Sequence, residues 1–85
     1  MPLALSDAVR CADTDRGVIL LDSRSRRYYE LNDTAATMLH ELLAGEDVTT
    51  LARRMSEAAQ LPFERVHDDL TALIKQLREL RLVEG

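Results

Sequence analysis

The segment GVILLDSRSRRYYELN, residues 17–32, constrains the fold of this chain more than any other stretch. Val18–Leu21 is a compact run of β-branched and aliphatic residues, which favour a pleated strand. Arg27–Leu31 is a second strand candidate, separated from the first by the turn cluster Asp22–Ser25. Strands joined by so short a turn pair as antiparallel neighbours. The segment therefore predicts a β-hairpin.

Alternation within the second strand of this hairpin assigns its side chains to two faces. Because side chains of a strand alternate with a period of two, Tyr29 and Leu31 share one face, and Tyr28 and Glu30 share the other. Tyr29 and Leu31 could simply form core while Tyr28 and Glu30 face solvent. The alternation alone leaves open which of the two tyrosines faces a peptide groove.

The N-terminal residues carry weaker signals. Residues 1–7 have little pattern, and we expect a loosely held lead-in there. Residues 8–12, AVRCA, alternate and predict a short strand, followed by a turn at DTDR and Gly17. Together with the hairpin, this strand would complete a three-stranded antiparallel meander.

The remainder of the chain has helical periodicity with clear start and stop signals. Asn32 or Asp33 can cap a first helix, which Gly45 ends by supplying a left-handed conformation. Asp47 or Thr49 can cap a second helix. These signals predict two short helices directly after the hairpin.

The third predicted helix is the longest. Pro62 suits its start because the missing N–H is harmless in the first turn. Its apolar stripe repeats at steps of four and three, with one residue widening it: Val66, Leu70, Leu73, Leu77, Leu80 and Ile74. Leu82 and Val83 follow as an apolar tail.

Strands followed by helices indicate an α+β fold with the helices on one face of the sheet. The expected architecture is winged-helix-turn-helix-like: a three-stranded antiparallel sheet followed by three helices, in one domain over residues 1–85. We expect no signal peptide and no membrane span, since no segment approaches about 20 consecutive apolar residues. The single cysteine allows no disulfide within the chain and fits a cytoplasmic protein.

Residues that could support catalysis are sparse. His40 and His67 lie within predicted helices, and neither has a serine or cysteine beside it in a nucleophile setting. Cys11 is expected to be a small buried hydrophobe. Asp68 and Asp69 are adjacent on a helix, so they point about 100° apart and cannot face each other. With no glycine-rich loop and no metal-ligand spacing, we expect neither an enzyme nor a metal or cofactor site.

The charge pattern disfavours nucleic acid as a partner. Residues 1–31 hold five Arg and five acids, whereas residues 32–85 hold six basic and ten acidic residues and therefore carry the whole net charge of −4. The first turns of the third helix, which would enter a DNA groove, hold Glu64, Asp68 and Asp69 against Arg65. A winged-helix DNA-binding regulator is therefore the alternative rather than the first hypothesis.

The predicted sheet has positive features of a peptide-binding surface. An extended peptide can add a strand to a free sheet edge, and the strand with Tyr28 and Tyr29 would supply that edge. Val66, Leu70 and Leu73 would form an apolar wall opposite it, unless these residues simply form core. The same edge could instead pair with a second copy of the chain, giving a homodimer.

A third hypothesis needs no sheet edge. The chain could be a small interaction subunit that docks helix to helix, through faces around Met38 and Met55.

The order of these motifs resembles the PqqD-like family, the peptide recognition elements of ribosomally made, modified peptides. The resemblance rests on GVILLD, on RYYELN running into a helix, and on a helical segment with DD-L-xx-L that ends in L-x-LV. It covers the chain from about Val9 to Val83, and the small stand-alone form is similar to the recognition protein of lasso-peptide gene clusters. The family often has glycine just before the final Leu-Val, where this chain has Arg81.

The resemblance implies a non-catalytic domain that binds the leader of a precursor peptide as an extra antiparallel strand. The leader would lie between the third strand and the third helix, and in lasso systems it tends to present a tyrosine and a proline. Its partners would be the precursor peptide, a leader-cleaving cysteine protease and a macrocyclase, with no nucleic acid and no membrane. Carried onto this sequence, the peptide-binding residues are Arg27, Tyr28, Tyr29, Glu30 and Leu31 on the strand, and Val66, Asp69, Leu70, Leu73, Ile74 and Leu77 on the helix.

Overall fold

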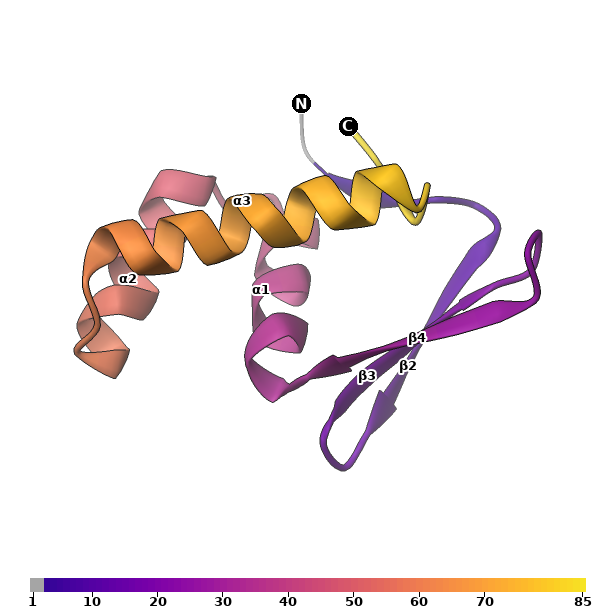
Figure 1. The fold of residues 1–85 in the computed structure, drawn as a ribbon, viewed down its shortest axis with the longest axis horizontal. Helices are drawn as coiled ribbons and strands as arrows, with labels where there is room; N and C mark the ends of the chain where they lie inside the picture. The colour runs from indigo at the N-terminus through magenta and orange to yellow at the C-terminus, as the bar shows by residue number, and fades with distance from the viewer. Residues whose placement is uncertain (1–2) are drawn as a thin grey trace.

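A three-stranded antiparallel meander forms the centre of the N-terminal half (Figure 1). The computed structural model describes residues 3–85. The sheet order is β2-β3-β4, with β2 at Val9–Thr14, β3 at Gly17–Asp22 and β4 at Arg27–Asn32. The predicted hairpin is therefore confirmed, and the preceding strand is longer than residues 8–12.

Gly17, at the start of β3, allows β3 to approach the end of β4 closely. Its φ is +148°, and a Cβ at this position would lie 1.9 Å from the carbonyl oxygen of Leu31 in β4. No side chain fits in that space, so any other residue would push the two strands apart.

Three helices follow the sheet, as expected. They are α1 (Asp33–Leu43), α2 (Val48–Ala59) and α3 (Phe63–Glu79). The Ala35 N–H donates to Asn32 Oδ1 at 2.9 Å, and the Thr50 N–H donates to Asp47 Oδ2 at 3.1 Å. These two side chains are the caps of α1 and α2, whereas Pro62 precedes α3 and offers no side-chain cap.

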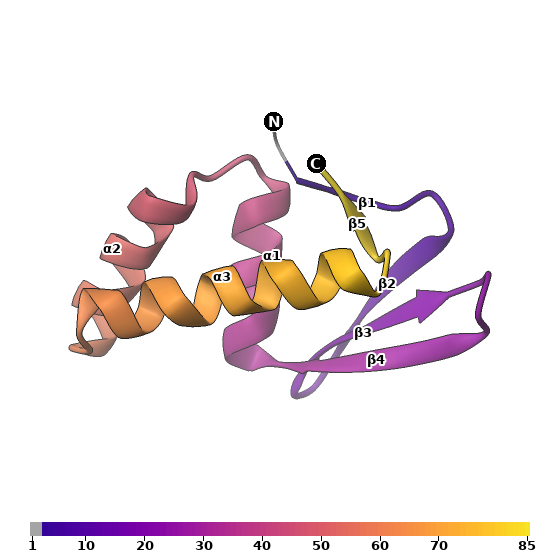
Figure 2. The ribbon, with the colours of Figure 1, turned by 45° about the horizontal axis from the view of Figure 1, so that its top comes forward.

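The two ends of the described chain form a second, two-stranded sheet (Figure 2). β1 (Ala4–Leu5) pairs antiparallel with β5 (Val83–Glu84), and the Ser6 N–H donates to the Leu82 carbonyl at 3.0 Å. The expectation of a loosely held lead-in is therefore wrong for residues 3–7, and residues 1 and 2 lie outside the described residues. The final apolar residues are likewise not a free tail.

The core lies between one face of the meander and the helices. Leu20 of β3, Leu39 of α1, Leu51 of α2 and Leu70 of α3 are almost fully buried, and Leu82 joins them from the C-terminal end. The α+β class and the three-strand, three-helix order are confirmed. No helix within residues 3–85 is long and apolar enough to cross a membrane.

The opposite face of the meander carries exposed apolar side chains. Leu21 on β3 is 46% exposed, and Tyr28, its partner across the ladder on β4, is 62% exposed. Within the part of the chain that the structure describes, α1 packs on the other face, against β3 and β4. The sheet thus has one covered face and one open face.

Candidate functional site

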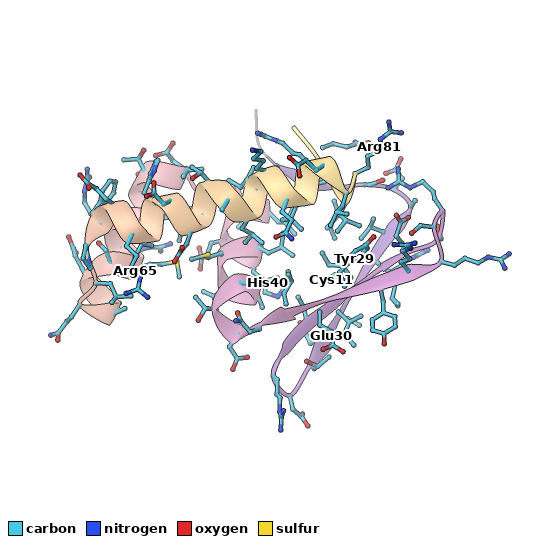
Figure 3. All side chains as sticks on the ribbon, viewed as in Figure 1. Cys11, Tyr29, Glu30, His40, Arg65 and Arg81 are labelled. Carbon is cyan, nitrogen blue, oxygen red and sulfur yellow. The ribbon has the colours of Figure 1, made fainter. Side chains whose placement is uncertain are left out.

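β4 is an edge strand. It pairs with β3 on one side, and in residues 3–85 no strand pairs with its other side. Tyr29 and Leu31 are half-buried and pack against the core, whereas Tyr28 and Glu30 are exposed. Figure 3 shows Tyr29 on the side of the sheet that faces α3 and Glu30 on the opposite side. The predicted division of β4 into two faces is confirmed, and the structure identifies Tyr29 as the tyrosine on the side of the core.

A hollow of about 320 Å³ lies between β4 and the C-terminal half of α3. We call it the β4–α3 groove. Its lining comes from Tyr28–Leu31 of β4, from Leu73, Gln76 and Leu77 of α3, and from Leu80 and Leu82 after α3. The groove therefore combines an unpaired strand edge with a wall of aliphatic side chains.

The predicted helix residues divide between the groove and other places. Leu73, half-buried, and Leu77, 3% exposed, line the groove. Val66 and Leu70 are 4% and 0% exposed and belong to the core cluster rather than to the groove lining. Ile74 lines a different hollow, which it shares with Leu3 and Leu42.

Of the three charged residues among the predicted positions, Glu30 lines the groove and the other two are exposed outside it. Arg27 stands at the start of β4, and Asp69 lies on α3. Neither is part of the groove lining. Their role in peptide binding stays a prediction.

The groove includes three residues that the sequence reasoning did not assign to it: Gln76, Leu80 and Leu82. The chain reverses after α3, because Arg81 has a φ of 59°. The Leu82 N–H donates to the Leu77 carbonyl at 2.9 Å and the Arg81 N–H to the Arg78 carbonyl at 3.0 Å. This pair of bonds is a Schellman ending, and it turns Leu82 back beneath the helix. A glycine at the position of Arg81 would have signalled it.

A polar contact ties the β3–β4 hairpin to the end of α3. Arg24 Nε lies 3.1 Å from Asp22 Oδ1, and the Arg24 guanidinium also donates to the Arg81 carbonyl. The buried Asp22 carboxylate accepts the Arg24 backbone N–H at 3.0 Å. These hydrogen bonds from Arg24 hold the pKa of Asp22 below its ordinary value, against the opposing effect of burial. Leu80 lies beside this contact and also lines the groove.

The cysteine and histidine side chains of residues 3–85 lie apart from the groove. Burial, followed by the negative charge of Asp13, raises the pKa of the Cys11 thiol, which opposes thiolate formation. His40 Nε2 lies 3.6 Å from Asp13 Oδ1 at the surface, and the ring of His67 stacks near Phe63 at 5.5 Å between centroids. In residues 3–85 no group of three potential metal ligands comes together.

Comparison with known proteins agrees with the motifs. The family described as coenzyme PQQ synthesis protein D (PqqD) matches residues 17–83, and the chain belongs to this family. Among solved structures, "Lasso peptide synthetase B1 complexed with the leader peptide" is similar at 30% identity and a TM-score of 0.93, covering 100% of both chains. "TbiB1 in Complex with the TbiA(beta) Leader Peptide" shares the fold at 24% identity and a TM-score of 0.85, covering 96% of this chain and 95% of the other. The comparison with curated proteins found no match.

Proposed function

We propose that this chain is a non-catalytic recognition domain, over residues 1–85, for the leader segment of a ribosomally made precursor peptide. The observation that carries the proposal is the unpaired edge of β4 beside the aliphatic β4–α3 groove. A similar protein, at 30% identity over its full length, was solved with a leader peptide bound. That likeness supports the same class of ligand for this chain.

The leader adds to β4 as an antiparallel fourth strand. Main-chain hydrogen bonds to the edge supply affinity, and alternate side chains of the leader enter the groove and supply selectivity. Tyr29, Leu31, Leu73 and Leu77 are the groove residues that these side chains contact. Their apolar character suits the tyrosine and proline that the family resemblance implies for a leader.

Recognition serves a partner enzyme in the cytoplasm. Holding the leader raises the local concentration of the precursor beside a leader-cleaving cysteine protease, and beside a macrocyclase where one takes part. A strand fixed in register also sets the distance from the held segment to the bond that is cut. A second copy of the chain pairing at β4 would compete with the leader for the edge.

The electrostatics of α3 argue against the DNA-binding alternative. Glu64, Asp68 and Asp69 are exposed on its first turns, where a recognition helix would approach phosphates. A gel-shift at low salt gives the direct comparison, and we expect no complex.

Substitution of Leu73 by Asp tests the groove. The probe is a fluorescently labelled leader peptide of a candidate precursor that binds the wild type, and it is titrated into wild type and variant. A carboxylate in an apolar wall costs about 1–3 kcal/mol, so we expect affinity to fall by about five- to 150-fold.

The matched control is Thr71→Asp, which places the same charge on the exposed face of α3, two residues away. Leu70→Asp is unsuitable, because Leu70 is fully buried in the core and the variant would unfold. Circular dichroism verifies that Leu73→Asp is folded. Unchanged affinity in the folded variant would remove the groove from the proposal.

A further inference from the structure

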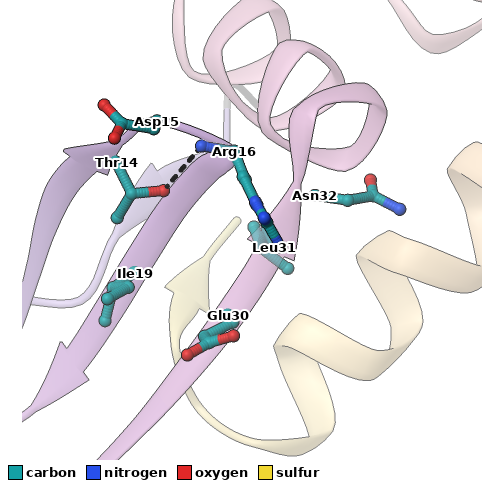
Figure 4. Close-up of a pocket in the computed structure, with 7 residues that line it drawn as sticks. All are labelled: Thr14, Asp15, Arg16, Ile19, Glu30, Leu31 and Asn32. Carbon is teal, nitrogen blue, oxygen red and sulfur yellow. Dashed lines mark hydrogen bonds between the residues drawn. The ribbon is translucent and has the colours of Figure 1, made fainter.

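A second hollow, of about 650 Å³, lies on the open face of the meander, where the β2–β3 turn meets the end of β4 (Figure 4). We call it the outer hollow. Thr14, Gly17 and Asn32 stand side by side in the ladder, and Gly17 contributes no side chain between the other two. Thr14 and Asn32 therefore line the outer hollow at this end of the sheet.

The outer hollow and the β4–α3 groove lie on the two sides of the same edge. Glu30 and Leu31 line both. Because successive side chains of a strand point to opposite faces, a strand added beside β4 sends only every second side chain into the groove. The remaining side chains of the added strand point to the open face, next to Tyr28 and Glu30. This step rests on the proposed function.

Glu30 is the charged residue of β4 that lies next to a peptide side chain on the open face. It is exposed on the unpaired strand, and no ion pair involves it in the part of the chain that the structure describes. A residue directly opposite on an added strand would have its Cβ about 4.5–5.5 Å from that of Glu30. Ile19, paired with Glu30 across the ladder, offers apolar surface beyond the carboxylate.

Arg16 also lines the outer hollow, and its positive charge would repel a basic side chain. It lies farther along the sheet than the position opposite Glu30. It precedes Gly17, and Gly17 pairs with Asn32 at the very end of β4, so Arg16 lies beyond the last position of the ladder. Figure 4 shows Arg16 near Leu31 and Asn32, with Glu30 one step back along the strand. The nearest charge to a side chain opposite Glu30 is therefore the carboxylate.

We propose that the outer hollow is a second recognition site, which takes a lysine or arginine side chain of the bound peptide at the position opposite Glu30. The ammonium or guanidinium pairs with the Glu30 carboxylate next to it, and the apolar surface of Ile19 lies beyond this pair. Peptide recognition at β4 is then two-sided: apolar side chains are read in the groove, and a basic one, an odd number of residues away, is read on the open face.

The test selects binders from a displayed library of random ten-residue peptides on the immobilised full chain, wild type and Glu30→Lys. For wild type we expect apolar residues at alternate positions and Lys or Arg enriched at one fixed intervening position. For Glu30→Lys the enrichment at that position should change to Asp or Glu. Arg10→Glu is the matched control, because Arg10 is exposed on the same face of β2, two strands away from β4.

Titration of one selected peptide measures the effect directly. Exchange of its basic residue for Gln should weaken binding to wild type about two- to fivefold, and the difference should shrink at about 1 M salt. It should vanish for Glu30→Gln. Alternating apolar enrichment without a charge preference, or with acids opposite Glu30, would overturn the second site and leave the groove intact. A wild-type library with no enriched peptide would contradict the proposed function itself.

Discussion

Arg81 adopts a backbone conformation that suits glycine. Its φ of 59° lies in the left-handed region, which costs an ordinary L-residue about 1–2 kcal/mol. Glycine removes that strain but loses about 0.5–1 kcal/mol of backbone entropy on folding. We therefore predict that Arg81→Gly raises the free energy of unfolding by about 0.5–1 kcal/mol. The melting temperature of an 85-residue domain should rise by a few degrees.

Arg81→Ala is the control for this prediction. It removes the same side chain and keeps the left-handed strain, while the Arg81 carbonyl that accepts from Arg24 remains in all three proteins. We expect Arg81→Ala to melt close to wild type. Equal stabilisation by both substitutions would show that the side chain, not the backbone conformation, is responsible.

Asp22 gives the fold a dependence on acid. Its pKa is lowered by folding, because Arg24 hydrogen-bonds to the ionised carboxylate. The unfolded chain therefore binds more protons as the pH falls, so this stabilisation is complete above the unfolded pKa of about 3.9 and is lost below it. We predict that Asp22→Asn is less stable than wild type at pH 7 and loses less stability between pH 5 and pH 3.

Urea unfolding across that pH range measures both proteins. Asp15→Asn serves as control, because Asp15 is an exposed carboxyl on the β2–β3 turn. Parallel pH curves for wild type and Asp22→Asn would refute the assigned role of the Arg24 contact.

At the scale of elements, the contribution of the β4 backbone N–H groups to leader binding can be tested separately from that of the β4 side chains. The two-residue turn between β2 and β3 makes Thr14 and Gly17 a hydrogen-bonded pair, and successive residues then alternate between neighbours. By this alternation, the N–H groups of Tyr28 and Glu30 point away from β3. We predict that Tyr28→Pro weakens leader binding more than Tyr28→Ala does, because only proline removes an edge donor.

The comparison is made by peptide titration, with thermal melts to check that both variants fold. Tyr29→Pro is expected to unfold the domain, since its N–H points toward β3. Equal affinity of the folded Tyr28→Pro and Tyr28→Ala proteins would argue that the leader does not bind by strand addition.

Local signals predicted most elements, and nonlocal contacts account for those that were missed. Caps at Asn32 and Asp47 and the stop at Gly45 depend on neighbouring residues, so they could be found in the sequence. The pairing of β1 with β5 joins residues near opposite ends of the chain, and two-residue strands have no periodicity to detect.

The groove shows the same division. The periodicity of α3 predicts that Leu70 and Leu73 lie on one apolar face of the helix. It does not predict which other residues cover each side chain. Leu70 is covered by the core, whereas Leu73 borders the unpaired β4. Leu82 enters the groove only because the chain turns at Arg81, where the usual glycine signal is absent.

At the scale of the whole molecule, the pairing of the two ends of the described chain holds Leu82, a residue of the groove lining, in position. Ser6 bonds to the Leu82 carbonyl, and the residue after Leu82 pairs with β1. We predict that a chain starting at Ser6 is destabilised by about 2 kcal/mol, mainly through loss of the buried Leu3, and binds the leader more weakly. The matched control starts at Leu3.

Urea unfolding and peptide titration measure the two effects. Since a domain of this length has about 4–13 kcal/mol of total stability, the truncated protein should remain mostly folded. Full affinity in the truncated protein would show that β1 does not help to hold Leu82 in place.

Occupying β4 would not remove an unpaired edge but transfer it to the ligand. A fourth strand satisfies β4 and then exposes its own outward-pointing amides and carbonyls as the new margin of the sheet. Along the residues that pair with β4, the bound peptide would thus be flanked by protein on one side and have an unpaired backbone edge on the other. A processing enzyme could therefore hydrogen-bond to the peptide backbone at this edge while the peptide stays bound to β4.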